Sequence, residues 1–309
     1  MPEICHPSFL LPSPLVPLHL SEKAGEAIRL FVKRDDMIHP WLSGNKYRKL
    51  KYNIEHARKI GATTLVTFGG PFSNHLYAVA GASAMYGFDS IGLVRGEPDD
   101  ENPTLRFCRE RGMELFFLSR EEYRLKEGSP FVRDLLSIID GSLLLPEGGT
   151  NADALPGCRE IMDEVQEQLG YSPDYLVLSA GTGGTAAGLL TYPHLKSRII
   201  VLPALRSGHL GDEISALTGG QNTHLLTVCN DYHFGGYAKY DRLLMDFIKD
   251  FNKLTGIDLD HVYTAKAMFG LLDLAGKGFF DPGSTVVFIH TGGLQGLAGL
   301  EYMLQKKKG

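Results

Sequence analysis

A short segment, Ser43 to Leu50 (SGNKYRKL), places a lysine where amine chemistry is favoured. Ser43 or Asn45 can cap a helix that begins here, so Lys46 falls in its first turn. The positive end of a helix dipole disfavours an ammonium group, and imine formation with a carbonyl requires a lysine of lowered pKa. Taken alone, a solvated lysine among basic neighbours explains this segment better, so it has to be weighed with two other junctions.

The second junction, Gly69 to His75 (GGPFSNH), follows a continuous apolar run. Its glycines permit a sharp turn, and Ser73 can cap a helix whose first N–H groups bind a carboxylate. The Asn74 amide can bind a phenolic oxygen. An ordinary helix cap followed by a surface His75 explains the segment equally well.

The third junction, Ser179 to Thr185 (SAGTGGT), joins a strand to a helix and offers backbone N–H groups and hydroxyls to a phosphate. The expected phosphate-binding residues are Ala180, Gly181, Thr182, Gly183, Gly184 and Thr185. The same loop fits the dinucleotide pattern G-x-G-x-x-[GA], which expects an acidic residue about 20 positions further on. That region holds no carboxylate, although Arg206 would suit NADP. A dinucleotide site would not explain the lysine-containing segment at residues 43–50.

The elements that must position these junctions alternate between strand and helix. Residues 63–68, 90–95, 114–118 and 142–145 are predicted strands, separated by helices such as 45–60 and 73–86. A second series contains the predicted strands 175–179, 199–202, 225–228 and 285–290, and helices at 152–169, 242–254 and 263–275. The alternation predicts an α/β fold with open, mainly parallel sheets and helices on both faces. We expect two domains, 1–50 with 150–309 as the larger and 51–149 as the smaller.

Composition excludes several classes of protein. The 309 residues carry a formal charge of −5 without an acidic or basic tail, which argues against a nucleic-acid partner. The four cysteines are scattered, so neither a disulfide framework nor a metal site is expected. Prolines interrupt the apolar N-terminal stretch, and no apolar run is long enough to span a membrane. We expect a cytoplasmic protein with no membrane partner.

Together the segments resemble fold-type II pyridoxal-phosphate enzymes (tryptophan synthase β-like), specifically the family of 1-aminocyclopropane-1-carboxylate (ACC) deaminase and D-cysteine desulfhydrase. The resemblance covers nearly the whole chain. Its most specific motifs, in the family's order, are GNKYRKL (44–50), FGGPFSNH (68–75), SAGTGGTAAG (179–188), VYTAKAM (262–268) and HTGG (290–293).

The resemblance implies pyridoxal 5′-phosphate as cofactor, Lys46 as the Schiff-base lysine, and the loop 180–185 around the phosphate. It places Asn74 at the cofactor's O3′ and Ser73 beside the substrate carboxylate or Cα. Tyr263 would lie on the substrate side of the ring, and His75 would also face the substrate. The family's second active-site tyrosine corresponds to Phe234 or Tyr237. Lys46 and Ser73 are both candidates for the base that removes the Cα proton.

Two positions separate the family's members. The deaminases carry glutamate after the tyrosine of the VY segment, at the pyridine nitrogen, and leucine after the histidine of the HxGG segment. Thr264 and Thr291 stand there, as in the desulfhydrases. A neutral hydroxyl gives a weaker electron sink than glutamate, which is sufficient when a good leaving group departs from Cβ.

The sequence therefore predicts a lyase that converts D-cysteine to pyruvate, ammonia and hydrogen sulfide. Another D-amino acid with a leaving group on Cβ is an open variant of this prediction. The alternatives are an ACC deaminase, an NADP-dependent oxidoreductase, and a non-catalytic cofactor carrier or ligand sensor. As for soluble enzymes generally and for this family, a homodimer is expected.

Overall fold

The computed structural model describes residues 8–19 and 28–306 and contains two β-sheets. The larger sheet has six strands in the order β1-β2-β10-β7-β8-β9. These strands span Leu15–Pro17 (β1), Arg29–Lys33 (β2), Thr285–Ile289 (β10), Tyr175–Ala180 (β7), Arg198–Pro203 (β8) and Leu226–Val228 (β9). Neighbouring strands are parallel, except that β1 pairs antiparallel with β2.

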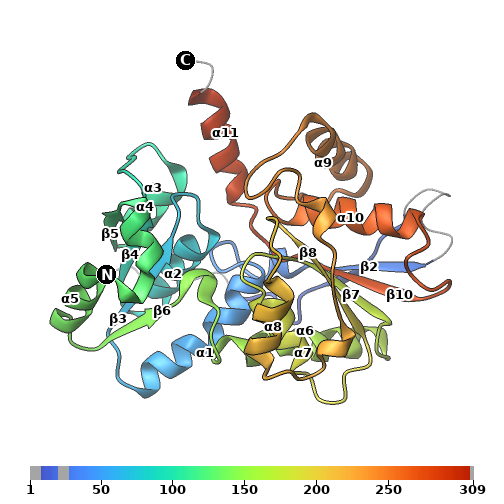
Figure 1. Ribbon diagram of the computed structural model, residues 1–309, viewed down its shortest axis with the longest axis horizontal. Helices are drawn as coiled ribbons and strands as arrows, with labels where there is room; N and C mark the ends of the chain where they lie inside the picture. The colour runs from blue at the N-terminus through green and yellow to red at the C-terminus, as the bar shows by residue number, and fades with distance from the viewer. Residues whose placement is uncertain (1–7, 20–27, 307–309) are drawn as a thin grey trace.

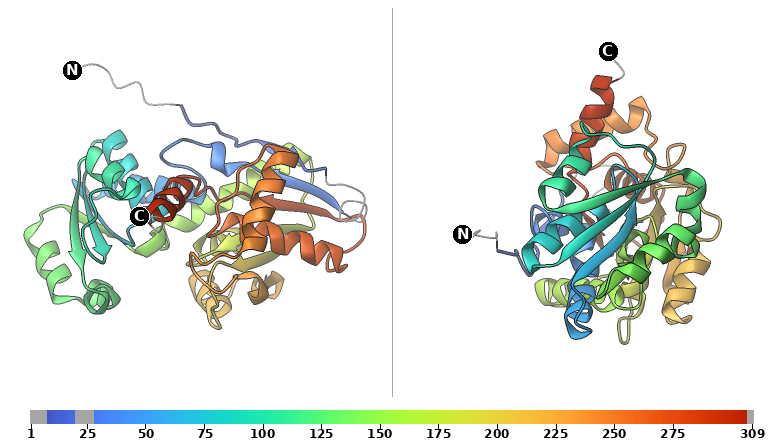
Figure 2. Two further views of the ribbon diagram at one scale, coloured as in Figure 1. Left: turned by 90° about the horizontal axis from the view of Figure 1, so that it is seen from above. Right: turned by 90° about the vertical axis from the view of Figure 1, so that its left-hand side faces the viewer.

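The smaller sheet has four parallel strands in the order β5-β4-β3-β6. They span Met113–Leu118 (β5), Asp89–Arg95 (β4), Thr64–Gly69 (β3) and Ser142–Leu145 (β6). The left view of Figure 2 separates the two sheets, and Figure 1 labels their strands. The smaller sheet is thus formed within residues 64–145, whereas the larger one uses the chain before and after that range.

Eleven α-helices surround the sheets within the described part of the chain. They are α1 (Asn45–Lys59), α2 (Asn74–Tyr86), α3 (Pro103–Glu110), α4 (Arg120–Leu125), α5 (Pro130–Ile138), α6 (Ala154–Leu169), α7 (Gly184–Leu190), α8 (Leu210–Thr218), α9 (Arg242–Thr255), α10 (Thr264–Gly276) and α11 (Gly296–Lys306). Helix α11 projects from the body at the top of Figure 1.

Each sheet is covered by apolar side chains on both faces. Along β10, Val286 and Phe288 belong to the cluster that packs under α9 and α10, whereas Val287 and Ile289 belong to the cluster with α6, α7 and α8. Because successive residues of a strand point to opposite faces, a strand buried on both sides must be apolar throughout. The smaller sheet shows the same division into two clusters.

A buried ionic network fixes the helix that carries the predicted lysine. The Arg48 guanidinium of α1 donates to the carboxylates of Asp35, at 2.9 Å, and Glu164 of α6, at 2.8 Å. Lys33 of β2 donates to the same Glu164 at 2.6 Å. Arg48, Asp35 and Lys33 have no exposed side-chain surface. Buried charges are tolerated only when they are paired in this way, so α1 is held against both β2 and α6.

The predicted α/β fold with helices on both faces of parallel sheets is confirmed. Helices α5 and α8 were not predicted, and neither was β1 within the proline-rich segment that was expected to be a surface arm. Part of that expected arm, residues 1–7 and 20–25, lies outside the described residues. The division into domains at residues 50 and 150 stays a prediction.

Candidate active site

A cavity of about 690 Å³ gathers most of the residues that the sequence singled out. It lies where β3, β7 and β10 end, as expected for the carboxyl edge of parallel sheets. The predicted residues that line it are Lys46, Ser73, Asn74, His75, Ala180, Gly181, Thr182, Gly183, Gly184, Thr185, Tyr237, Tyr263 and Thr291. Thr264 and Phe234 are absent from the lining. Tyr237 is therefore the aromatic residue of its loop that reaches the cavity.

Lys46 lies in the first turn of α1. The residue at the cap position is Gly44, with φ 62°, and neither Ser43 nor Asn45 caps the helix as expected. A Cβ at Gly44 would come within 2.0 Å of the Thr291 carbonyl oxygen, so only glycine allows α1 to start this close to the segment after β10. The Asn45 side chain instead donates to the Thr185 hydroxyl at 3.0 Å.

The Lys46 amine is a nucleophile at neutral pH. Burial, and to a smaller extent the neighbouring Lys49 ammonium, lower its pKa to about 7. Its Nζ lies 3.5 Å from the Gly148 carbonyl oxygen, a long contact that leaves the amine free to react. Desolvation and a second positive charge are two of the means by which proteins activate a lysine.

The loop between β7 and α7 packs against a second lysine. Lys49 donates to the Thr150 hydroxyl at 2.8 Å and to the Gly148 carbonyl at 3.2 Å. A Cβ at Gly184 would stand 2.6 Å from the Thr150 hydroxyl and 3.0 Å from Lys49 Nζ, so glycine is needed for this approach. Burial lowers the pKa of Lys49 to about 8. The structure shows no carboxylate paired with Lys49 in residues 8–19 and 28–306, so its charge is available to an anion on the glycine-rich loop.

The Ser73–His75 junction begins α2 as predicted. The Ser73 hydroxyl oxygen accepts from the backbone N–H groups of His75 and Leu76, both at 3.2 Å. The His75 ring is buried against Gly149. Burial and the nearby Lys46 and Lys49 charges hold the pKa of His75 well below its usual range. His75 is therefore a neutral imidazole on the cavity wall.

The loop that leads into α10 forms the opposite wall of the cavity. The Tyr263 and Tyr237 rings meet edge to face with centroids 6.0 Å apart. Burial raises the pKa of Tyr263 well above its usual range, so its hydroxyl is neutral. A Cβ at Gly181 would be 3.4 Å from the Tyr263 ring, which places this tyrosine beside the glycine-rich loop.

The two discriminating threonines have different surroundings. The Thr291 hydroxyl lines the cavity and lies 3.1 Å from that of Ser179. The Thr264 hydroxyl is fully buried and donates to Asp260 Oδ1 at 2.7 Å. The same carboxylate accepts from the N–H groups of Val262, Tyr263 and Thr264, and it lines the cavity. A direct contact of Thr264 with the cofactor stays a prediction, and its observed partner is Asp260.

Sequence reasoning missed Lys49 and Asp260 as cavity residues. The signal for Lys49 was its spacing from Lys46, because residues three apart lie on one face of a helix. No pattern in the sequence marks Asp260, since it lies in the loop before α10 and reaches the cavity only through the turn that it stabilises.

This set of residues fits pyridoxal phosphate. A lysine of lowered pKa is available for the aldehyde, the loop with Lys49 for the phosphate, Asn74 for the ring hydroxyl, and Thr291 for a further contact with the ring. Cavity size also agrees, because sites for ligands of this size fall in the range of about 300–1,000 Å³.

Comparison with known proteins gives the same answer. The sequence profile of the family described as "Pyridoxal-phosphate dependent enzyme" matches residues 8–292. The chain belongs to this family, and it is a pyridoxal-phosphate-dependent enzyme. The glycine-rich loop is thus explained by this cofactor, in place of the NADP that its pattern also permitted.

Similar proteins indicate which members of this family the chain resembles. The chain is 34% identical over 305 residues to a Thermotoga maritima protein provisionally named 1-aminocyclopropane-1-carboxylate deaminase, covering 93% of this chain and 96% of the relative. It is 32% identical over 295 residues to the "Bifunctional D-cysteine desulfhydrase/1-aminocyclopropane-1-carboxylate deaminase, mitochondrial" of Arabidopsis thaliana, covering 87% and 73%. A crystal structure described as an ACC deaminase homologue superposes with a TM-score of 0.82 at 28% identity, covering 95% and 93%.

Two further observations concern partners. Among the helices of residues 8–19 and 28–306, none is long and apolar enough to cross a membrane. The same residues hold no group of three or more histidine, cysteine, aspartate or glutamate side chains arranged to bind a metal ion.

Proposed function

We propose that this enzyme eliminates a leaving group from Cβ of a small D-amino acid, and that D-cysteine is its substrate, with pyruvate, ammonia and hydrogen sulfide as products. The observation that carries this proposal is the neutral Thr291 hydroxyl on the cavity wall, where the deaminase pattern has leucine. Thr264, where the deaminase pattern has glutamate, is likewise neutral and bonded to Asp260.

The electronic argument concerns the ring nitrogen. Pyridoxal phosphate, when bound, draws electrons from Cα of an attached amino acid and makes its proton removable. A hydroxyl beside the ring nitrogen supports this withdrawal less strongly than a carboxylate would. Thiolate is a good leaving group, so its elimination needs only the weaker electron withdrawal. Opening a cyclopropane ring needs stronger electron withdrawal. The pair Thr264 and Thr291 therefore favours elimination of hydrosulfide.

Two groups on the cavity wall are suited to proton transfer. The Lys46 amine, with a pKa of about 7, would hold the cofactor, and it could accept the Cα proton once the substrate's amino group has displaced it there. Ser73 is the second candidate, because its oxygen accepts two backbone N–H groups, which would stabilise the alkoxide that must form before Ser73 can accept a proton. The N-terminal turn of α2 favours a substrate carboxylate at this place.

The other residues would bind and orient the cofactor and the substrate. Lys49 and the loop 180–185 would hold the phosphate, and Asn74 the ring hydroxyl. Tyr263 and Tyr237 would face the substrate side of the ring, with the neutral His75 nearby.

One assay tests the proposal. Purified protein supplied with pyridoxal phosphate is incubated with D-cysteine, and sulfide and pyruvate are measured in the same tube. We expect both products in equal amounts, none with Lys46→Ala, and far less from L-cysteine. A cofactor-bound protein that releases neither product from D-cysteine contradicts the assignment.

The second candidate is ACC deamination, and the bifunctional name of the Arabidopsis relative supports it. Ammonia and 2-oxobutanoate formed from ACC, without sulfide from D-cysteine, would favour it. A cofactor carrier or ligand sensor would show the cofactor's absorbance and no turnover of either compound.

We also propose a homodimer and a cytoplasmic location for the chain. Size-exclusion chromatography with light scattering tests the first, and fractionation of cells that express the protein tests the second. A monomer, or recovery of the protein outside the cytoplasmic fraction, would contradict the respective proposal.

A further inference from the structure

Two irregular segments form the part of the cavity wall that faces Tyr263. Leu205 follows β8, and Tyr237 and Ala238 belong to the loop between β9 and α9. Within this loop Phe234 and Ala238 have φ values of 51° and 54°. Residues with side chains adopt this left-handed conformation only where surrounding contacts hold it. The loop therefore needs an anchor.

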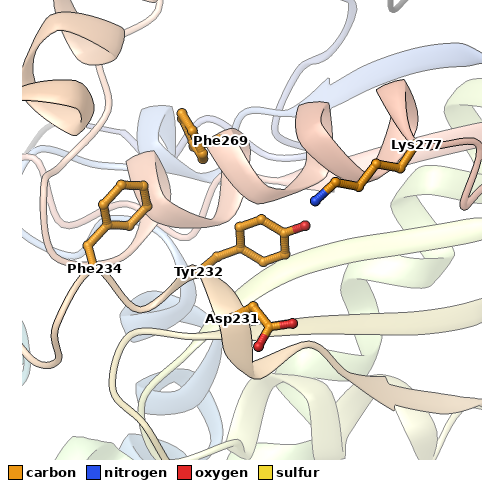
Figure 3. Close-up of a pocket in the computed structure, with 5 residues that line it drawn as sticks. All are labelled: Asp231, Tyr232, Phe234, Phe269 and Lys277. Carbon is orange, nitrogen blue, oxygen red and sulfur yellow. The ribbon is translucent and has the colours of Figure 1, made fainter.

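Aromatic contacts anchor the outer side of the loop. Figure 3 shows Tyr232 and Phe234 beside Phe269 and Lys277 of helix α10 and its end. The Phe234 and Phe269 rings meet edge to face at 5.1 Å, and the Tyr232 hydroxyl donates to Asp273 at 2.7 Å. The surface hollow between these side chains measures about 330 Å³. These contacts end at residue 234, so they do not directly hold the backbone that precedes Tyr237.

Lys266 anchors the inner side. This lysine of α10 is 1% exposed, and its ammonium donates to the carbonyl oxygens of Gly236 at 2.7 Å, His233 at 2.9 Å and Ala204 at 3.3 Å. An ammonium has three N–H donors, and here each meets a backbone acceptor. Gly236 directly precedes Tyr237, and Ala204 directly precedes Leu205. One side chain thus connects both wall segments to the helix that begins beside Tyr263.

We propose that Lys266 is a positioning residue for substrate binding, which holds Leu205 and Tyr237 in place on the cavity wall through the backbone carbonyls that precede them. The inference rests on the proposed function only in taking this cavity as the active site. Lys266 is not among the residues that line the cavity, so it acts through the loop.

The test compares Lys266→Met with wild type by two independent readouts. Met fills similar volume but donates no hydrogen bond, so three backbone carbonyls lose a partner. We expect trypsin to cleave at the exposed Lys239 of the loop about tenfold faster, because local opening governs such cleavage. We expect KM for D-cysteine to rise about tenfold while kcat changes less than about twofold, since uniform binding is lost.

Lys277→Met is the matched control. Lys277 lies at the end of the same helix and contacts Asp273, and the Tyr232–Asp273 hydrogen bond remains when it is replaced. This variant should retain the wild-type cleavage rate and KM. Equal cleavage of Lys266→Met and wild type would overturn the proposal, as would an unchanged KM despite faster cleavage.

The cleavage assay needs no substrate, so its outcome is independent of whether D-cysteine is turned over. If Lys266→Met does not fold, hydrogen exchange on the wild-type protein decides the matter. Slow exchange of the amides at 233–238 supports an anchored loop. Exchange at the rate of an unstructured peptide would overturn the proposal.

Discussion

The side-chain amide of Gln295 donates a hydrogen bond of 2.8 Å to Oδ1 of Asn74. Gln295 directly precedes α11, and Asn74 begins α2, so this contact joins two junctions distant in sequence. A Cβ at Gly293 would stand 2.8 Å from Asn74 Nδ2, which marks where the amide's donor end points. Because Gln295 engages the oxygen, the nitrogen remains available as a donor, as the proposed contact of Asn74 with the cofactor's ring hydroxyl requires.

Gln295→Leu should weaken cofactor binding without unfolding the protein. Losing this one hydrogen bond frees the Asn74 amide to rotate, which costs about 1 kcal/mol, or about fivefold in Kd for pyridoxal phosphate. Titration of the cofactor-free protein, followed by absorbance, measures the change. Gln305→Leu, the same replacement at an exposed site on α11, is the control. Equal affinities for both variants would show that Gln295 does not orient Asn74.

The low pKa of Lys46 predicts how cofactor binding depends on pH. Only the neutral amine attacks an aldehyde, and burial lowers the pKa of Lys46 to about 7. The rate at which cofactor-free protein acquires the yellow absorbance should therefore rise with pH through about 7 and then level off. An ordinary lysine would give a rate that still rises near pH 10.

Lys49→Met offers an internal check on that profile. The Lys49 charge is one cause of the lowered pKa of Lys46, so its removal should move the midpoint to higher pH. If the midpoint does not move, burial alone accounts for the lowered pKa of Lys46. The effect is read from the rate profile, so it does not depend on turnover of any substrate.

The sequence was most informative where burial on both faces demands apolar residues. The strands β3 and β7 appear as continuous apolar runs, and their ends locate the second and third junctions. Ser73 at the cap of α2 and Gly87 after it were also predicted, because both follow from local backbone chemistry. The main features of the fold and the glycine-rich loop thus depend on short-range rules.

Contacts between distant segments could not be predicted in this way. Gly44 begins α1 because the Thr291 backbone lies against it, a constraint from 247 residues away in the chain, and the residues around it suggest a side-chain cap instead. Asp260 engages the Thr264 hydroxyl, which the family resemblance assigns to the cofactor. Strand β1 has three residues and depends on its pairing with β2. The glycines near α8 weaken the sequence pattern that would predict a helix there.

Lys49→Met should also affect cofactor affinity through the phosphate. A charge-assisted contact to phosphate is worth about tenfold to a hundredfold in affinity, so Kd for pyridoxal phosphate should rise by that factor. Pyridoxal, which lacks the phosphate, should bind both proteins alike when the two are compared at a pH above the Lys46 midpoint of each. Lys51→Met is the matched control, because Lys51 lies on the same helix and pairs with Glu160 at the surface. A parallel loss of pyridoxal binding would mean that Lys49 supports the fold of the site and not the phosphate.

The close approach of Gly44 to Thr291 predicts a large difference between two similar substitutions. In Gly44→Ala the new Cβ would stand 2.0 Å from a backbone oxygen at a φ of 62°, so the start of α1 must shift and carry Lys46 with it. We expect a loss of about 3–5 kcal/mol in the free energy of unfolding, measured by urea denaturation of the cofactor-free protein. Gly61→Ala, at the other end of α1, has a φ of 71° but no atom within 4 Å of its Cβ. This variant should lose only about 1 kcal/mol in the free energy of unfolding, because alanine is strained at a positive φ, and it should keep full cofactor binding. Similar losses for both variants would show that the Thr291 backbone does not determine where α1 begins.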